Sequence, residues 1–387
     1  MLNKQFFNDY FGEKKEEKEK KKILYIGWIG HKNLGDDLMW ELFSEYFEEK
    51  FGKQDWELHG TLRKPAKEFD LDTFDLIVLG GGSIICKDHI PFLHRAVEKG
   101  KKVMIWGSGI DLINKKDVPL LEAGKKINVQ DYYSINLQEK LNEVIEQAEF
   151  FGVRGPLTYE IIKQMGANEK KVMISGDPAF LLTSRSNIDK EAKEAILPFK
   201  GNKIIGVNWG TSYNYLYGGN EGAVENQLAE ALKALIQKGY KVYLYTVWDQ
   251  DIPSVKQLYK KINDQQNVII DTNLHDKNFL IDLLSHFHFT INFKLHANYL
   301  SLGAETPPIP LAYRFKVIDF AQSIDLDRFI ISTDSKTIKD EILKHESTIN
   351  LERESIVEKM KNKKAEYMNL ISEPFTKNLY FNDVEKG

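Results

Sequence analysis

Arg154, Lys294 and His296 are the residues of this 387-residue chain whose types and positions favour chemistry on an anionic ligand. Each comes at or just after an apolar run, where a strand is expected to end. Arginine and lysine hold carboxylates and phosphates through charge-assisted hydrogen bonds. Because His296 would begin a helix, its protonated form is disfavoured until an anion binds, and it can then deliver a proton. An ordinary ion pair for Arg154 and a packing role for His296 are the alternatives.

A second group with chemical potential is a glycine-spaced turn that follows the apolar residues 23–26. It reads Gly27-Trp28-Ile29-Gly30-His31-Lys32-Asn33-Leu34-Gly35-Asp36-Asp37. The spacing matches neither a Walker loop nor a dinucleotide-binding fingerprint. Two carboxylates at the start of a helix suit the helix dipole but repel a phosphate. The turn therefore predicts a site for hydroxyl groups or a hinge, and a tight turn with helix caps is the purely structural alternative.

Short apolar runs alternate with amphipathic segments, which is typical of parallel sheets covered by helices on both faces. The first series of expected strands comprises residues 23–26, 56–59, 76–79, 103–106, 150–153 and 172–175. The second series comprises residues 204–208, 242–245, 268–270, 287–291, 309–311 and 329–332. We therefore predict a charged N-terminal lead-in at 1–22, an α/β domain at 23–190, a second at 191–336 and a helical segment at 337–387.

In open α/β sheets, ligands bind beyond the carboxyl ends of the strands. The run Gly80-Gly81-Gly82-Ser83 and the side chain of Trp209 also come at such ends. Backbone donors at Gly82 and Ser83 can hold an anion or let a sugar approach, although the run can also serve only a tight turn. Trp209 can stack on a sugar face or pack in a core. If the two sheets face each other, these residues line one cleft.

Composition excludes several classes of protein. The net charge of -4 and the pI near 6.2 give no general attraction for nucleic acid. Cys86 is the only cysteine, so no intrachain disulfide forms, and no cysteine pair or His-Glu-x-x-His motif supports a metal site. Without a run of about 18 apolar residues, we expect a cytoplasmic protein. Contact with the inner face of a membrane stays open, because the lead-in carries the aromatic residues Phe6, Phe7, Tyr10 and Phe11.

Taken in order, these motifs resemble those of polysaccharide pyruvyl transferases. The turn at 27–37 is similar to the family pattern Gly-x-x-Gly-x-x-Asn-x-Gly-Asp-Asp/Glu. Further similarities are Leu79–Ser83, Gly107–Ile110, Val153–Pro156, Gly176–Phe180 and Tyr313–Lys316. The resemblance implies two Rossmann-like domains facing across a cleft, as in the GT-B arrangement. It also implies transfer of the carbon skeleton of phosphoenolpyruvate, as a co-substrate, onto a sugar as a cyclic ketal with release of phosphate and without a cofactor.

The resemblance also implies roles for the cations. Arg154 corresponds to the arginine that contacts phosphoenolpyruvate, and His296 to the histidine of an Arg-x-His signature that here reads Lys294-Leu295-His296. Lysine keeps the charge but loses the two-pronged hydrogen bond of arginine. Protonation of the donor's methylene carbon requires a positioned acid, which we assign to His296. Arg154 and Lys294, with Lys316, would hold the carboxylate and phosphate of the donor.

The acceptor implied by the resemblance is a saccharide of a cell-surface polysaccharide, such as a capsule or exopolysaccharide, or its lipid-linked precursor. The residues expected to meet it are Asn33, Gly35, Asp36, Asp37, Gly82, Ser83 and Trp209. Asp36 or Asp37 is the candidate base for an acceptor hydroxyl. Two other readings stay open: a GT-B glycosyltransferase that uses a nucleotide sugar, and a non-catalytic binding homologue, for which Lys294 is the hint.

Overall fold

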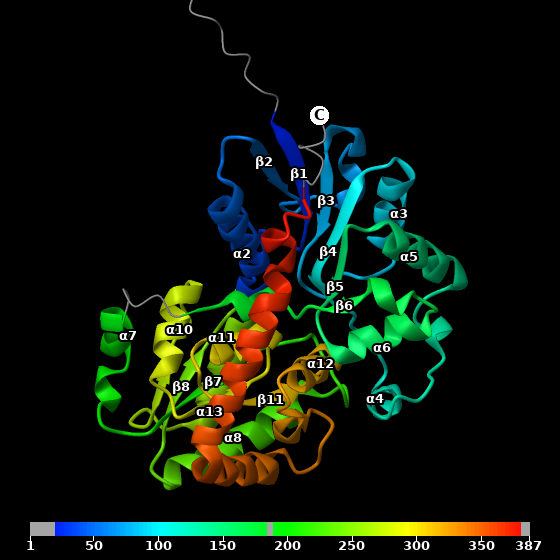
Figure 1. Cartoon of the computed structure of the whole chain (residues 1–387). Coiled ribbons are helices and arrows are strands. Elements are labelled where there is room, and N and C mark those ends of the chain that lie inside the picture. Colours follow the sequence, from blue (N-terminus) through cyan, green and yellow to red (C-terminus); the bar gives the residue numbers. More distant parts are fainter. Residues whose placement is uncertain (1–19, 184–188, 381–387) are drawn as a thin grey trace, which may run out of the picture.

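The computed structural model describes residues 20–183 and 189–380, and it contains two parallel six-stranded sheets in two domains (Figure 1). The first sheet has the order β2-β1-β3-β4-β5-β6, with β1 (Lys21–Ile26), β2 (Trp56–Gly60), β3 (Leu76–Leu79), β4 (Lys102–Ser108), β5 (Phe150–Val153) and β6 (Met173–Ile174). The second has the order β12-β11-β10-β7-β8-β9, with β7 (Ile204–Asn208), β8 (Lys241–Tyr245), β9 (Val268–Ile270), β10 (Phe289–Asn292), β11 (Pro308–Ala312) and β12 (Ile331–Ser332).

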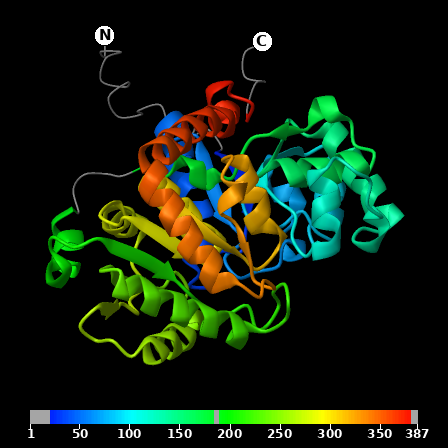
Figure 2. The ribbon, with the colours of Figure 1, turned by 90° about the horizontal axis from the view of Figure 1, so that it is seen from below.

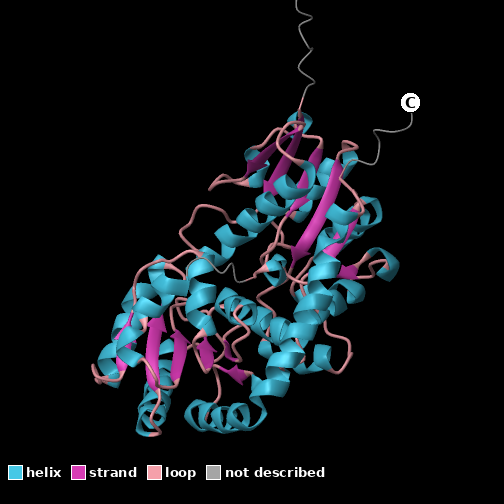
Figure 3. Cartoon of the chain, turned by 60° about the vertical axis from the view of Figure 1, so that its left-hand side comes forward, coloured by secondary structure: helices cyan, strands magenta, loops and turns pink. Residues whose placement is uncertain are grey.

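Helices cover both faces of each sheet, and Figure 3 shows the two groups of strands separated by helices and loops. The helices of the first domain are α2 (Leu34–Phe51), α3 (Ile90–Glu98), α4 (Val118–Glu122), α5 (Ile135–Gln147) and α6 (Pro156–Gln164). Those that follow are α7 (Asp189–Ala195), α8 (Glu221–Gln237), α9 (Ile252–Ile262), α10 (Lys277–Ser285), α11 (Leu295–Gly303), α12 (Phe315–Ser323) and α13 (Ile338–Thr376).

The predicted fold class is confirmed, because every expected strand is present with its ends shifted by a few residues. The apolar runs form strands because both faces of these parallel sheets are buried, as the four buried residues of β3 illustrate. No strand end differs from the expected one by more than two residues; β10, for example, begins at Phe289 rather than at 287. The expected lead-in at 1–22 lies mostly outside the described residues. The expected division at 190/191 stays a prediction; α7 begins at Asp189 and packs against α10.

Each sheet has a point where the strand order reverses, and these points locate the site. In the first sheet β1 pairs with both β2 and β3, and in the second β7 pairs with both β8 and β10. A crevice opens at such a point beyond the carboxyl ends of the strands. The loops that leave β1, β3, β7 and β10 are therefore expected to carry the ligand-binding residues.

The long helix α13 holds the two domains together, and Figures 1 and 2 show it running beside both. Near its start, Glu346 accepts hydrogen bonds from Lys238 Nζ at 2.7 Å and Tyr240 Oη at 2.9 Å in the second domain. Near its end, the carbonyl of Ile371 accepts a hydrogen bond from the indole of Trp106 in β4 at 2.8 Å. The ring of Phe375 packs against that same indole, with centroids 5.5 Å apart. None of the helices in the described part of the chain is long and apolar enough to cross a membrane.

This packing predicts unequal effects for two apolar substitutions in α13. The Ile371 side chain is fully buried against the first domain, whereas Leu351 is 86% exposed. Ile371→Ala is expected to lower the free energy of unfolding by about 2–5 kcal/mol, because it leaves a cavity. Leu351→Ala, the matched control, is expected to change it by less than about 0.5 kcal/mol. Urea titration of both variants measures the difference, and equal effects would contradict the bridging role of α13.

Candidate functional site

The glycine-spaced turn after β1 reaches across to the second domain. Asn33 caps α2, its side-chain oxygen accepting a hydrogen bond from the Gly35 amide at 3.1 Å. The next amide, that of Leu34, donates to the carbonyl of Val247 in the second domain at 3.0 Å, and Asn33 forms an isolated bridge with Trp248. The turn is therefore fixed by contacts from both domains.

The two carboxylates that follow Gly35 have different surroundings. Asp37 Oδ1 accepts the amide hydrogen of Gly30 at 2.5 Å, so this carboxylate closes the turn. Asp36 is partly buried beside Gly82 and faces cations of the second domain. Burial raises the pKa of Asp36 to about 6, against the opposing effect of Lys316. Of the two aspartates, Asp36 is therefore the one whose carboxylate can interact with a ligand.

His296 lies in the first turn of α11 and touches the glycine turn of the other domain. A Cβ atom added to Gly35 would lie 1.9 Å from His296 Nδ1, so only glycine leaves room for the ring. His296 Nε2 is buried and has no hydrogen-bond partner among the described residues. Burial lowers the pKa of His296 to about 3, with further lowering from Lys316 and Arg154. The imidazole is therefore neutral at pH 7 until an anion offsets these cations.

Two cations of the second domain share one carboxylate of the first. Arg314 Nε lies 3.2 Å from Asp111 Oδ2, and Lys316 Nζ lies 3.8 Å from the same oxygen. Lys316 and Arg314 hold the pKa of Asp111 below its usual range, although burial works in the opposite direction. One carboxylate cannot neutralise both cations.

The pKa of the neighbouring Tyr313 reflects this excess of positive charge. Its side chain is buried, and burial alone raises the pKa of a phenol. Lys316, Arg314 and Lys294 outweigh burial and lower the pKa of Tyr313 to about 8. A buried phenol with a lowered pKa marks a site where an anion is stabilised.

Lys294 is already engaged with its own domain. Its ammonium donates to the carbonyl of Thr211 at 2.6 Å, lies 3.1 Å from Asp251 Oδ1 and sits 4.6 Å from the ring centroid of Trp248. Asp251 is fully buried. Lys294 therefore contributes positive charge to the site, while Arg314 and Lys316 have fewer competing partners.

Arg154 is completely buried, which changes the role expected for it. Its guanidinium donates to Ser83 Oγ at 3.2 Å and to the carbonyl of Ile110 at 3.0 Å, and its Nε lies 3.9 Å from Asp319 Oδ2. A direct contact with a ligand would require these groups to move. Its charge nevertheless lowers the pKa of nearby His296. Arg154 is thus placed to position Ser83 and to supply positive charge.

The glycine run after β3 forms a tight turn against β4. Gly82 has a φ of 108°, which favours glycine, and its carbonyl accepts the Gly109 amide at 2.7 Å. A Cβ on Gly82 would lie 3.9 Å from Asp36 Oδ1, so this turn and the Asp36 carboxylate are neighbours. Gly82 and Ser83 therefore lie beside Asp36, as the strand-end argument predicts.

Trp209 does not join the site. Its indole is buried, donates to Glu225 Oε2 at 2.9 Å and packs on Phe293 at a centroid distance of 4.8 Å. Trp209 is therefore a core residue, and we withdraw the expected contact with an acceptor. The apolar run before Trp209 showed that a strand ends there. It did not show on which side of the sheet the indole would lie.

The site contains four residues that were given no role from the sequence. Arg314, Tyr313, Asp111 and Asp251 all contact or perturb its charged groups. Arg314 and Tyr313 belong to the motif Tyr313–Lys316, in which only Lys316 was expected to bind a ligand. Asp111 lies in a loop and Asp251 ends a short 3-10 helix before α9, and the spacing of these two residues alone carries no signal.

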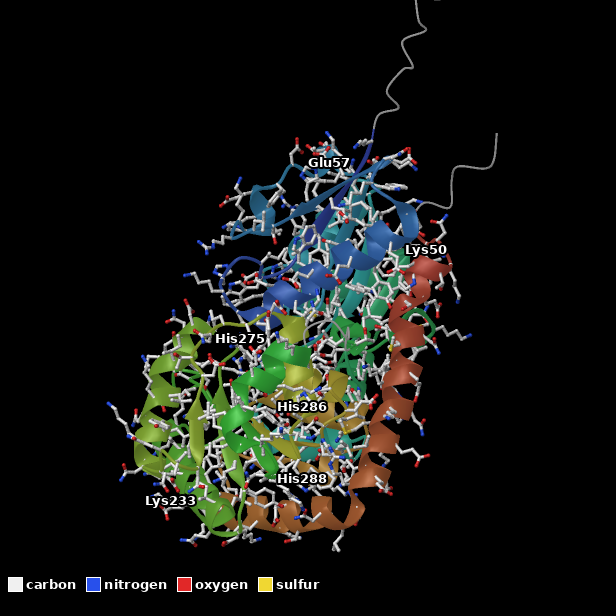
Figure 4. The ribbon with its side chains drawn as sticks, turned by 90° about the vertical axis from the view of Figure 1, so that its left-hand side faces the viewer. Lys50, Glu57, Lys233, His275, His286 and His288 are labelled. Carbon is white, nitrogen blue, oxygen red and sulfur yellow. The ribbon has the colours of Figure 1, made fainter. Side chains whose placement is uncertain are left out.

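Other histidines lie apart from this cluster. Figure 4 places His288 farther from the first domain than His275. His288 Nε2 lies 2.8 Å from Asn350 Oδ1 of α13. Among the residues that the structure describes, no group of three or more His, Cys, Asp or Glu side chains could hold a metal ion, and metal-independent chemistry stays a prediction.

The geometry thus combines an anion-stabilising set from the second domain with a carboxylate from the first. His296, whose pKa burial and nearby cations lower, lies against Gly35 between them. Such an arrangement can hold a small polyanion, protonate it and activate a hydroxyl group with Asp36.

Several solved structures share this architecture at low sequence identity. UDP-GlcNAc 2-epimerase from Neisseria meningitidis, bound to UDP-GlcNAc, is 13% identical with a TM-score of 0.57, covering 93% of this chain and 100% of the other. MnaA of S. aureus, solved with UDP, is 12% identical with a TM-score of 0.56, covering 93% and 97%. HepE of Anabaena, in complex with UDP and glucose, is 10% identical with a TM-score of 0.52, covering 93% and 99%. This chain therefore has the GT-B fold.

A comparison with curated protein sequences found no match. A family model described as polysaccharide pyruvyl transferase matches residues 33–314, which include Asp36, Arg154, Lys294, His296 and Arg314. The match spans well over half of the chain and both domains. The chain belongs to the polysaccharide pyruvyl transferase family.

Proposed function

We propose that this protein transfers the carbon skeleton of phosphoenolpyruvate to a saccharide acceptor as a ketal and releases phosphate. The observation that carries the proposal is that Arg314 and Lys316 lie 3.2 and 3.8 Å from a single carboxylate, that of Asp111, which leaves a local excess of positive charge. Phosphoenolpyruvate carries a carboxylate and a phosphate, and it would neutralise that excess. The family membership supports the same substrate class.

Arg314 and Lys316 would hold the donor. Both share Asp111 in the structure, so a bound polyanion would compete with that carboxylate for them. Lys294, which is engaged with Thr211 and Asp251, would add positive charge without direct contact. This assignment modifies the role expected from the sequence, where Arg154 and Lys294 were the principal donor contacts. Arg154 would instead hold Ser83 and strengthen the positive field.

His296 would protonate the methylene carbon of the donor. Burial is the main cause of the low His296 pKa, and Lys316 and Arg154 lower it further; phosphoenolpyruvate would offset these two charges and so would raise that pKa. Proton transfer to the terminal carbon leaves C2 electron-poor, and a sugar hydroxyl then forms a bond to C2. Departure of phosphate from C2 and attack by a second hydroxyl would close the ketal.

Asp36 would take the proton from the acceptor hydroxyl. Its pKa of about 6 leaves it mainly ionised at pH 7 and still basic enough to receive a proton. Asp37 is excluded from this role by its hydrogen bond to Gly30. Asn33, Gly82 and Ser83 would line the acceptor side, because they surround Asp36 in sequence or in space.

Replacing His296 tests the assignment of the acid. His296→Gln is expected to lower the rate of phosphate release from phosphoenolpyruvate about 10²–10⁴-fold, because general acid catalysis is lost. His288→Gln is the matched control and is expected to retain activity, since His288 contacts Asn350 of α13. Activity of His296→Gln within a few-fold of the wild type would remove this residue from the mechanism.

Gly35 offers an independent test that leaves every charged group in place. Gly35→Ala would put a methyl group 1.9 Å from His296 Nδ1 and displace the ring, so phosphate release is expected to fall about as far as in His296→Gln. Gly222→Ala in α8 is the control, because the nearest atom to its added Cβ is 3.5 Å away. Full activity of Gly35→Ala would show that the position of this imidazole is not critical.

Donor binding is expected to take up a proton. Calorimetric titration of phosphoenolpyruvate at pH 7 in two buffers of different ionisation enthalpy measures this uptake, because bound anion raises the pKa of His296 and Asp36. His296→Gln and Asp36→Asn should each reduce the uptake. The same titration with a nucleotide sugar is expected to show weaker binding, and tight binding of the nucleotide sugar with none of phosphoenolpyruvate would favour a glycosyltransferase instead.

A further inference from the structure

A pocket borders the start of the glycine-spaced turn, whereas His296 contacts Gly35 near the end of the turn. The pocket has a volume of about 270 Å³, and its lining includes Trp28, His31, Arg63, Lys64, Ile84 and His89. These residues come from the loops that follow β1, β2 and β3, at the carboxyl edge of the first sheet. None of them takes part in the donor site described above. We call this the first-domain pocket.

The first-domain pocket contains two cations, Arg63 and Lys64, that are not paired with carboxylates among the described residues. Neither Arg63 nor Lys64 forms an ion pair with an acidic residue in the described part of the chain, whereas Lys294, Arg314 and Lys316 each lie near an aspartate. The Arg63 Nε donates to the carbonyl of Gly30, which leaves the two outer nitrogens of its guanidinium without a protein partner there. Two unpaired cations side by side favour an anionic ligand.

The backbone around Arg63 is held in an unusual conformation that fixes its position. Leu62 and Arg63 have φ values of 29° and 64°, in the left-handed region that non-glycine residues rarely adopt. The Arg63 amide donates to the carbonyl of Ile29 at 3.1 Å, and Thr61 Oγ1 donates to the carbonyl of Gly27 at 2.7 Å. Strained backbone that neighbouring contacts hold in place is characteristic of binding sites.

The rest of the pocket suits a ligand with an apolar or glycosyl part beside its charge. Trp28 is 60% exposed and meets His31 edge to face, with ring centroids 5.2 Å apart. An exposed indole can cover a sugar face or an alkyl chain. The volume of about 270 Å³ is close to the lower limit of small-molecule sites, so it fits a head group better than a whole oligosaccharide.

We infer that the first-domain pocket binds the diphosphate or phosphodiester that links the acceptor saccharide to its carrier. The position follows from the turn itself, which presents Trp28 and His31 to this pocket and Asp36 to the donor site. An acceptor whose sugar lies at Asp36 can extend its phosphate toward Arg63 and Lys64. The link to an acceptor rests on the proposed function, but anion binding by the pocket does not.

The test uses the full-length double variant Arg63→Gln/Lys64→Gln. The Michaelis constant for a saccharide on a short prenyl diphosphate is expected to rise roughly tenfold for each lost cation, with kcat nearly unchanged. The constants for phosphoenolpyruvate and for the methyl glycoside of the same sugar should stay within about twofold. Lys67→Gln, an exposed lysine that does not line the pocket, is the control and should behave as the wild type.

A parallel calorimetric titration with the same saccharide diphosphate, and with pyrophosphate alone, separates the two proposals. Loss of this binding in the double variant supports the pocket even if no acceptor is pyruvylated, in which case the proposed function fails by itself. Comparing the sugar on prenyl diphosphate with the sugar on uridine diphosphate identifies the natural source of the phosphate. Unchanged binding and an unchanged Michaelis constant for the diphosphate acceptor, or an equal rise for the methyl glycoside, would overturn the inference.

Discussion

Charge shared between the domains is the constraint on which the site depends. Asp111 of the first domain lies within 3.2 Å of Arg314 and 3.8 Å of Lys316 of the second, and Asp36 faces the same cations. Buried charges are costly unless they are paired, so neither set would be stable alone. Each domain therefore supplies what the other needs, and the remaining positive charge is available to a polyanionic substrate. The cations lower the pKa of Tyr313 against the effect of burial, and they add to burial in lowering the pKa of His296.

The architecture keeps these partly buried groups in register by contacts farther away. Asp319 of α12 accepts hydrogen bonds from the amide of Leu157 at 2.9 Å and the hydroxyl of Thr158 at 2.7 Å, at the start of α6 in the other domain. Lys277 of α10 lies 3.0 Å from Glu41 and 2.6 Å from Glu45 of α2. With α13 packed along both domains, these contacts fix how Gly35 meets His296. A Cβ atom at position 35 would lie 1.9 Å from His296 Nδ1, so the imidazole fits only against glycine.

Much of this fold was predictable, because buried parallel strands must be short continuous apolar runs and helices between them must be amphipathic. Because ligands bind beyond the carboxyl ends of parallel strands, the sequence also placed five site residues at the correct edge of their sheets. These are Asp36, Gly82, Ser83, Lys316 and His296. The sequence could not show the direction of a side chain, which depends on the backbone of the loop. Trp209 accordingly turned into the core, and Arg154 became enclosed by Ser83 and Ile110. Pairing across the domains, as for Asp111, depends on tertiary packing that local sequence does not encode.

The glycine-spaced turn now has two faces with separate roles. One face brings Gly35 and Asp36 to the cations of the second domain, and the other borders the first-domain pocket with Trp28 and His31. The sequence predicted a site for hydroxyl groups or a hinge at this turn, because Asp36 and Asp37 would repel a phosphate. The structure places Arg63 and Lys64, on the loop that follows β2, in the same pocket as the start of this turn, which the spacing of the turn could not reveal.

The central claim is that a pyruvyl group passes from phosphoenolpyruvate to a sugar at the boundary between the domains. The most direct measurement is mass spectrometry of a panel of glycosides and carrier-linked saccharides incubated with the protein and phosphoenolpyruvate, with phosphate measured in parallel. A saccharide that gains a ketal-linked pyruvyl group, with one phosphate released for each group transferred, is the predicted result. Phosphate release without any gain in saccharide mass, or a saccharide extended only when a nucleotide sugar is supplied, would contradict it.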